Sequence, residues 1–197
     1  MRRPRRQRLT VFSVLAAGIA LVVPAAAADA ALDINACSLL QPVEIQRVLG
    51  SPVEPGQRLD SGLESNGAYS SSCLWLMRSD TQPAEPRPGL AGRSYVILNA
   101  MQWPAGSRKA RSFLESFHAA KASGVLTAAL VPKDFGDEAL WWGDGLAVVR
   151  RDVSFGLSIR HAAGRKEPPG ASEGRLARTV LQRLEDRSGG SGRASGQ

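Results

Sequence analysis

The sequence of 197 residues has few of the features that mark enzyme active sites. Its two histidines, His118 and His161, lie in no HExxH motif and in no cluster with metal-ligand spacing. It also has no GxSxG segment, which excludes the usual nucleophile elbow of a serine hydrolase. Residues 134–136 spell a kinase DFG triplet, but an HRD segment and a glycine-rich phosphate loop are missing. The sequence therefore predicts no catalytic residue, no metal and no cofactor.

Cysteine is equally scarce, and Cys37 and Cys73 are the only two. In an exported chain an even number of cysteines favours a disulfide, which here would close a loop of 36 residues. The chain-entropy model gives such a bond roughly 3–4 kcal/mol of stabilisation. Lipid attachment at Cys37 is the alternative, because residues 34–36 loosely resemble a lipobox. Asparagine fits that motif poorly, and Cys37 lies 14 residues beyond the end of the apolar run, so the disulfide is favoured.

The N-terminus has the layout of a secretory signal peptide. Five arginines come within the first eight residues, an apolar run covers residues 9–23, and small residues allow cleavage near Ala28 or Ala30. An uncleaved membrane anchor is the alternative, since residues 9–28 are long enough to span a bilayer. The pair Arg5-Arg6 also leaves twin-arginine export open beside the general secretory route. We expect a signal peptide over residues 1–30 and a secreted or periplasmic mature chain without a stable membrane span.

The strong positive charge belongs largely to this N-terminal segment. The whole chain has a formal net charge of +7, whereas residues 31–197 contain 20 basic and 17 acidic residues, a net charge of +3. Nucleic-acid binding would require a basic stripe or patch within the domain itself. We therefore expect no nucleic-acid partner.

Hydrophobic periodicity predicts an α+β fold for a single domain over residues 31–187. Helical patterns cover residues 42–49, 107–121 and 172–187, and strand patterns cover 69–77, 93–102, 139–142, 146–151 and 154–161. The last strand alternates apolar and polar residues, which indicates a sheet with one solvated face. We expect a two-layer sandwich in which an antiparallel sheet of about five strands has its helices packed on one face. Residues 51–67 and 79–92 are predicted to be loops, and the Gly/Ser-rich residues 188–197 are predicted to be a disordered tail.

Two adjacent tryptophans, Trp141 and Trp142, are the candidate binding surface. Neighbouring residues of a strand face opposite sides of the sheet, so both rings cannot enter the same core. One ring is expected either on the open face, as a platform for a ligand, or beneath a second covering layer. The nearby acidic residues Asp134, Asp137, Glu138 and Asp144 could bind a divalent ion if they converged, but solvated charges around a turn are the simpler interpretation.

Four short segments together resemble those of a known family. The segments are Cys37-Ser38-Leu39-Leu40-Gln41-Pro42-Val43-Glu44, Val48-Leu49-Gly50, Cys73-x-Trp75 and Phe135-Gly136-Asp137-Glu138-Ala139. They are similar to motifs of small exported proteins and lipoproteins of the DUF3558 type. The resemblance covers about residues 35–187. It implies an envelope-associated α+β domain of unknown function and carries no catalytic residues. Gln41 replaces the usual threonine, and the expected cleavable signal replaces a lipobox.

These observations predict an exported, non-catalytic accessory domain that binds an unknown small molecule or an envelope protein. Two alternatives remain open at the level of sequence. One is an enzyme with dispersed residues such as Asp137, Glu138 or His161, which would have to converge in one pocket. The other is a purely structural envelope protein that acts only through protein contacts.

Overall fold

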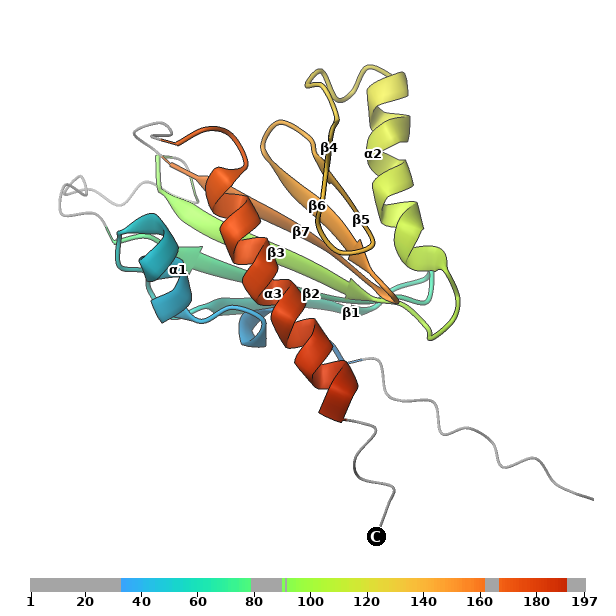
Figure 1. Cartoon of the computed structure of the whole chain (residues 1–197), viewed down its shortest axis with the longest axis horizontal. Coiled ribbons are helices and arrows are strands. Elements are labelled where there is room, and N and C mark those ends of the chain that lie inside the picture. Colours follow the sequence, from blue (N-terminus) through green and yellow to red (C-terminus); the bar gives the residue numbers. More distant parts are fainter. Residues whose placement is uncertain (1–32, 79–89, 91, 162–166, 191–197) are drawn as a thin grey trace, which may run out of the picture. The chain divides into compact units, whose positions relative to one another are not determined.

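The structure is a computed structural model that describes residues 33–78, 90, 92–161 and 167–190. Within these residues the chain forms an α+β fold in which a seven-stranded antiparallel sheet packs against α-helices (Figure 1). The predicted signal peptide, most of the proline-rich loop and residues 191–197 of the predicted tail lie outside the described residues.

The sheet consists of two antiparallel meanders that join at its centre. The strand order is β1-β2-β3-β7-β6-β5-β4, and β3 pairs with β7 along its whole length, from Tyr95 opposite Arg160 to Gln102 opposite Val153. The first meander contains β1 (Gln57–Leu63), β2 (Tyr69–Leu76) and β3 (Tyr95–Gln102). The second contains β4 (Val131–Lys133), β5 (Glu138–Trp141), β6 (Gly145–Arg150) and β7 (Val153–Arg160).

The expected number of about five strands is too low because the sequence pattern misses both edge strands. β1 lies in a segment predicted as a loop, and nearly all its residues are exposed, so it has no apolar alternation to detect. β4 has only three residues and contains Pro132, which is tolerated in a sheet at an edge position. Each of these two strands pairs with one neighbour only, β1 with β2 and β4 with β5. Its strand conformation depends on that pairing rather than on a pattern in its own residues.

Short sequence signals determine where the helices begin and end. Helix α1 (Pro42–Leu49) begins with a proline at its first turn, where no N–H is lost, and ends at Gly50, whose φ of 69° suits glycine. The Gln41 N–H donates to the Glu44 carboxylate at 2.7 Å, as in a capping box. Helix α2 (Ser112–Ala122) follows a short 3-10 turn, η2 (Lys109–Arg111), and α3 (Ala171–Gly190) continues three residues into the segment expected to be a disordered tail.

The main core lies between the sheet and α3, which crosses the strands in Figure 1. The helix buries its apolar stripe of Leu176, Ala177, Val180 and Leu184. The facing strand residues are Cys73, Trp75, Met77, Val96, Leu98, Ala100, Leu146, Val148, Phe155, Leu157 and Ile159. Helix α1 packs beside α3, and the Arg183 guanidinium donates to the Glu44 carboxylate at 2.7 Å.

Helix α2 covers the opposite face of the sheet, so the expectation that all helices pack on one face is wrong. A second core forms there from Leu114 and Ala110 together with Leu140, Ala147 and Val149, which alternate along β5 and β6 with the residues of the main core. Trp103 joins this core, and its indole N–H donates to Ser154 Oγ at 3.0 Å. The second meander is thus covered by helices on both faces.

The disulfide between Cys37 and Cys73 is confirmed in the structure. It ties the 3-10 turn η1 (Ala36–Ser38) to the centre of β2, with a Cα–Cα distance of 5.0 Å. A buried hydrogen bond runs parallel to it, since the Ala36 N–H donates to Ser71 Oγ at 3.0 Å. The N-terminal segment that precedes α1 is therefore fixed to the sheet beside the C-terminal half of α3.

Candidate functional site

The two tryptophans of the candidate binding surface face opposite sides of the sheet, and other residues cover both. Trp141 belongs to the main core and is 7% exposed. A Cβ atom at Gly170 would lie only 3.2 Å from its ring, so this backbone packs directly on the indole. Trp142 is half-buried in the second core, where its ring centroid lies 4.8 Å from that of Phe117 on α2. Trp141 leaves almost no surface for a ligand and Trp142 is partly covered by Phe117, so we place the candidate site elsewhere.

The acidic residues and histidine of the dispersed-enzyme hypothesis have separate partners. Asp137 bonds to Arg150, whereas Glu138 pairs with Arg111 at 2.9 Å. His161 lines a different cavity, which lies at the ends of β3 and β7. Within the described residues, no group of three or more His, Cys, Asp or Glu side chains could hold a metal ion.

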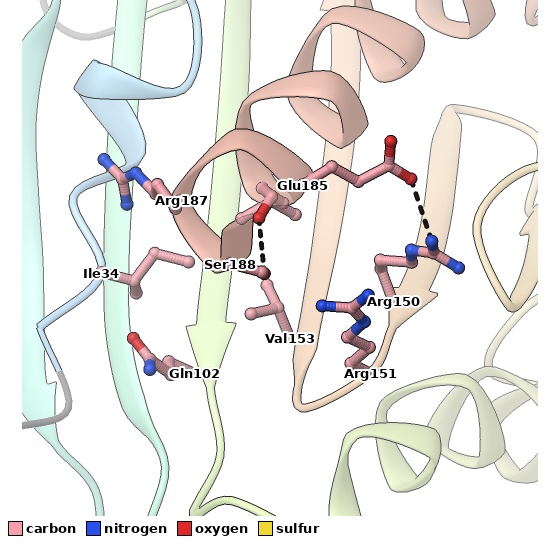
Figure 2. A pocket seen from close by; sticks show the side chains of 9 residues that line it. Ile34, Gln102, Arg150, Arg151, Val153, Glu185, Arg187 and Ser188 are labelled. Carbon is pink, nitrogen blue, oxygen red and sulfur yellow. Dashed lines mark hydrogen bonds and ion pairs between the residues drawn. The ribbon is translucent and has the colours of Figure 1, made fainter. Parts of the chain in front are cut away.

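A cavity of about 240 Å³ lies between the β6–β7 hairpin and the C-terminal half of α3, and we call it the arginine pocket (Figure 2). Three arginines reach it from two elements: Arg150 and Arg151 from the hairpin and Arg187 from α3. Figure 2 shows the hairpin arginines on one side of the pocket and Arg187 on the other. The remaining lining residues are Ile34, Gln102, Val153, Leu184, Glu185 and Ser188.

The β6–β7 turn holds Arg151 in a strained backbone conformation. Arg151 has a φ of 53°, in the left-handed region that glycine and asparagine normally occupy. The Arg151 N–H donates to the Asp137 carboxylate at 2.5 Å. The neighbouring Asp152 accepts from the Trp103 N–H at 2.8 Å and from the Gly106 N–H at 3.1 Å. These bonds hold an arginine in a conformation that costs about 1–2 kcal/mol, and such strain is frequent at functional sites.

Arg150 is fixed by two carboxylates. Its guanidinium donates to Asp137 at 2.6 Å and to Glu185 on α3 at 2.9 Å. The hydrogen bond to Asp137 is the main cause that raises the pKa of Arg150, so this side chain stays charged. Its Nε atom is buried, and no acceptor among the described residues reaches it. A buried donor without a partner costs about 1–3 kcal/mol.

Asp137 holds the turn and Arg150 together as a charged carboxylate. Burial acts to raise the pKa of Asp137, but the hydrogen bonds from the Arg151 N–H and the Arg150 guanidinium outweigh it. The net result is a lowered pKa, which keeps Asp137 ionised at neutral pH. The carboxylate therefore positions both hairpin arginines without lining the pocket itself.

The other side of the pocket combines polar groups with an apolar floor. Arg187 donates to Ser38 Oγ, which ties it to the disulfide-bonded turn. The Ser188 hydroxyl donates to the Leu184 carbonyl at 2.8 Å, one turn earlier on α3. Ile34 and Leu184 are 1% and 8% exposed, and with Val153 they form the apolar part of the lining. The pocket can thus accept a charged group and a small apolar group at the same time.

Sequence reasoning missed this pocket. Arg150-Arg151-Asp152 follows the apolar strand β6, and an arginine pair in a hairpin turn is the local signal that could have drawn attention to it. Arg187 lies 36 residues after Arg151 on a helix whose charged residues resemble any solvated face. Only the docking of α3 on the sheet brings the two together.

Comparisons with known proteins add no relative. A scan against protein-family models, a search of curated proteins and a search of solved structures each found no match to this chain. Among the helices of the described part of the chain, none combines the length and the apolar character that crossing a membrane requires.

Proposed function

We propose that this protein is exported and acts outside the cytoplasm as a non-catalytic binding domain of the cell envelope, similar to DUF3558-type proteins. The signal-like residues 1–30 and the CSLLQPVE motif support the proposal. The Cys37–Cys73 disulfide is consistent with an oxidising compartment, where such bonds form and persist. The ligand is a small molecule or a group displayed by an envelope component.

The arginine pocket is the observation that carries the binding role. A concave site with an apolar lining and a few convergent polar groups is the usual form of a ligand site. Here the polar groups are held by a strained turn, and the buried Nε of Arg150 lacks an acceptor among the described residues. An enzyme would need groups that transfer protons to converge in one pocket. Here Asp137 bonds to Arg150, Glu138 pairs with Arg111, and His161 lines a different cavity.

A ligand screen by NMR tests the binding role without assuming the chemistry of the ligand. Isotope-labelled protein is titrated with a panel of neutral, cationic and anionic small molecules. We expect at least one class to shift the amide signals of Ile34, Gln102, Val153 and Leu184, and to leave those of Leu59 and Val131 on the edge strands unchanged. If no compound shifts the pocket signals, the domain does not bind small molecules there, and a purely structural role is favoured.

Export is tested by recovering the full-length product from its host cells. Mass spectrometry of the extracytoplasmic fraction should give a mature N-terminus after Ala28 or Ala30, an oxidised Cys37–Cys73 pair and no acyl group on Cys37. Protein that stays in the cytoplasm with its first 30 residues intact would contradict export.

A further inference from the structure

We propose that the arginine pocket binds an anionic amphiphile, meaning a single carboxylate- or phosphate-type oxyanion joined to an apolar group. This inference rests on the proposed binding role and names the chemistry of the ligand.

The net charge of the pocket favours an anionic ligand. Arg150 is shared by the carboxylates of Asp137 and Glu185, so these three residues have a net charge of −1. Arg151 and Arg187 bring two further positive charges and no additional carboxylate to the lining. The site as a whole therefore has one positive charge in excess, which attracts an oxyanion.

The available donors suit an oxyanion better than a neutral ligand. No side chain among the described residues accepts a hydrogen bond from the Arg151 guanidinium, although the backbone of this residue is firmly held. Arg150 uses its two terminal nitrogens for carboxylates and its Nε is buried, so the free donors of the site come from Arg151. Guanidinium groups bind carboxylates and phosphates through several N–H donors at once, and such charge-assisted bonds are stronger than neutral ones.

The apolar lining defines the second part of the ligand. Ile34, Val153 and Leu184 lie in the same cavity as the three arginines. The volume of about 240 Å³ is smaller than that of typical sites for whole drug-sized ligands, which span about 300–1,000 Å³. The pocket therefore encloses the charged head and the first few carbon atoms, and the rest of a longer ligand would extend beyond it.

A purely structural explanation accounts for only part of this arrangement. Arg187 lies in the last turns of α3, where a cation interacts favourably with the negative end of the helix dipole. Arg151 does not lie at a helix end and so has no helix dipole to stabilise. It occupies a turn position where glycine or asparagine would be less strained. Arg108 has a similar φ outside the pocket, so the strain alone does not indicate a ligand; what favours an anion is that Arg151 lines the same cavity as Arg150 and Arg187.

Isothermal titration calorimetry with hexyl phosphate and hexanoate tests the inference on the oxidised domain. Hexanol and inorganic phosphate supply the apolar and anionic halves of the probe separately. We expect the two amphiphilic anions to bind, inorganic phosphate to bind more weakly, and hexanol not to bind at all. Raising the NaCl concentration should weaken binding of both anions, because salt screens the attraction between charges.

Two arginine variants provide a matched comparison. Arg151→Asn and Arg108→Asn each remove one positive charge at a residue with a positive φ, 53° and 57° respectively, which asparagine tolerates. Of these two arginines, Arg151 lines the pocket and Arg108 does not. We expect Arg151→Asn to lower the affinity for hexyl phosphate at least about tenfold, the loss typical of one charge-assisted hydrogen bond, and Arg108→Asn to leave it within about twofold. Circular dichroism should show both variants folded.

Sedimentation with vesicles separates the two possible sources of the anion. Binding to phosphatidylglycerol but not to phosphatidylcholine vesicles, lost in Arg151→Asn, would support a lipid head group. Binding of hexyl phosphate or hexanoate alone would support a free metabolite.

The inference is overturned if hexanol binds as well as hexyl phosphate, or if both asparagine variants weaken binding equally. It also fails, while the binding role stands, if neutral or cationic compounds shift the pocket signals in the NMR screen and anions do not. A pocket that responds to no compound of any class overturns both proposals together.

Discussion

Removal of the disulfide is the sharpest test of how the N-terminal segment is held. The double variant Cys37→Ala/Cys73→Ala opens a loop whose ends are 36 residues apart, and this loop contains α1, β1 and the first half of β2. Alanine is preferred to serine because Cys73 is fully buried, and a hydroxyl there would need a partner.

The size of the effect follows from chain entropy. Cross-linking residues separated by 36 positions removes conformational freedom from the unfolded chain that corresponds to about 3.8 kcal/mol at 25 °C. For a domain of this size, each kcal/mol changes the melting temperature by about 2–4 °C. We therefore expect the double variant to melt roughly 8–15 °C below the oxidised protein.

Urea unfolding followed by circular dichroism measures the loss directly. The oxidised protein treated with a reducing agent is the control, and it should agree with the alanine variant to within about 1 kcal/mol. The unfolded variant is also less compact, so the urea dependence of its unfolding free energy should be steeper. A loss below about 1 kcal/mol would refute the reasoning, because it would mean that the hydrogen bond from Ala36 to Ser71 and the core contacts alone hold this segment.

Three further predictions follow from packing and charge. Gly56→Ala should destabilise the fold by about 1–3 kcal/mol in urea unfolding, because its Cβ would lie 2.6 Å from Cys73 Sγ; wild-type stability would contradict this close approach. Acrylamide should quench mainly the fluorescence of Trp142, and removing this residue by Trp142→Phe should abolish most of the quenching, since the other tryptophans are at most 7% exposed. Asp137→Asn should lower stability by less than about 1 kcal/mol at pH 6, because its side chain is 41% exposed. Because the pKa of Asp137 is lowered in the folded state, its stabilisation is present above the unfolded-state pKa of about 3.9 and is lost as the pH falls through the folded-state pKa. The stability difference between variant and wild type should therefore shrink as the pH falls below about 3.9, and a difference that stays constant would be the contrary result.

Several elements could be predicted because their signals lie within a few residues of one another. Pro42 and Gly50 define the ends of α1 through their own backbone preferences, and the alternation in residues 154–160 indicates a strand whose apolar side chains enter one core. The opposite orientation of Trp141 and Trp142 follows from strand geometry alone. The disulfide followed from counting, since two cysteines permit a single intramolecular bond.

The remaining features depend on residues that are distant in the chain. The edge strand β1 has no apolar pattern of its own and exists because β2 offers it hydrogen-bonding groups. The apolar stripe of α2 indicates that this helix is buried, but not which face of the sheet it covers. In the same way, Arg151 and Arg187 become one cationic site only because α3 crosses the end of the β6–β7 hairpin.

The sequence by itself thus determined the fold class, the disulfide and the positions of the helices, because short-range backbone preferences and hydrophobic periods specify them. The tertiary structure alone decided the seven-stranded sheet order, the layers on both faces and the arginine pocket. Strand pairing, helix docking and the convergence of charges are contacts between distant residues, and their free energies depend on the whole packed arrangement.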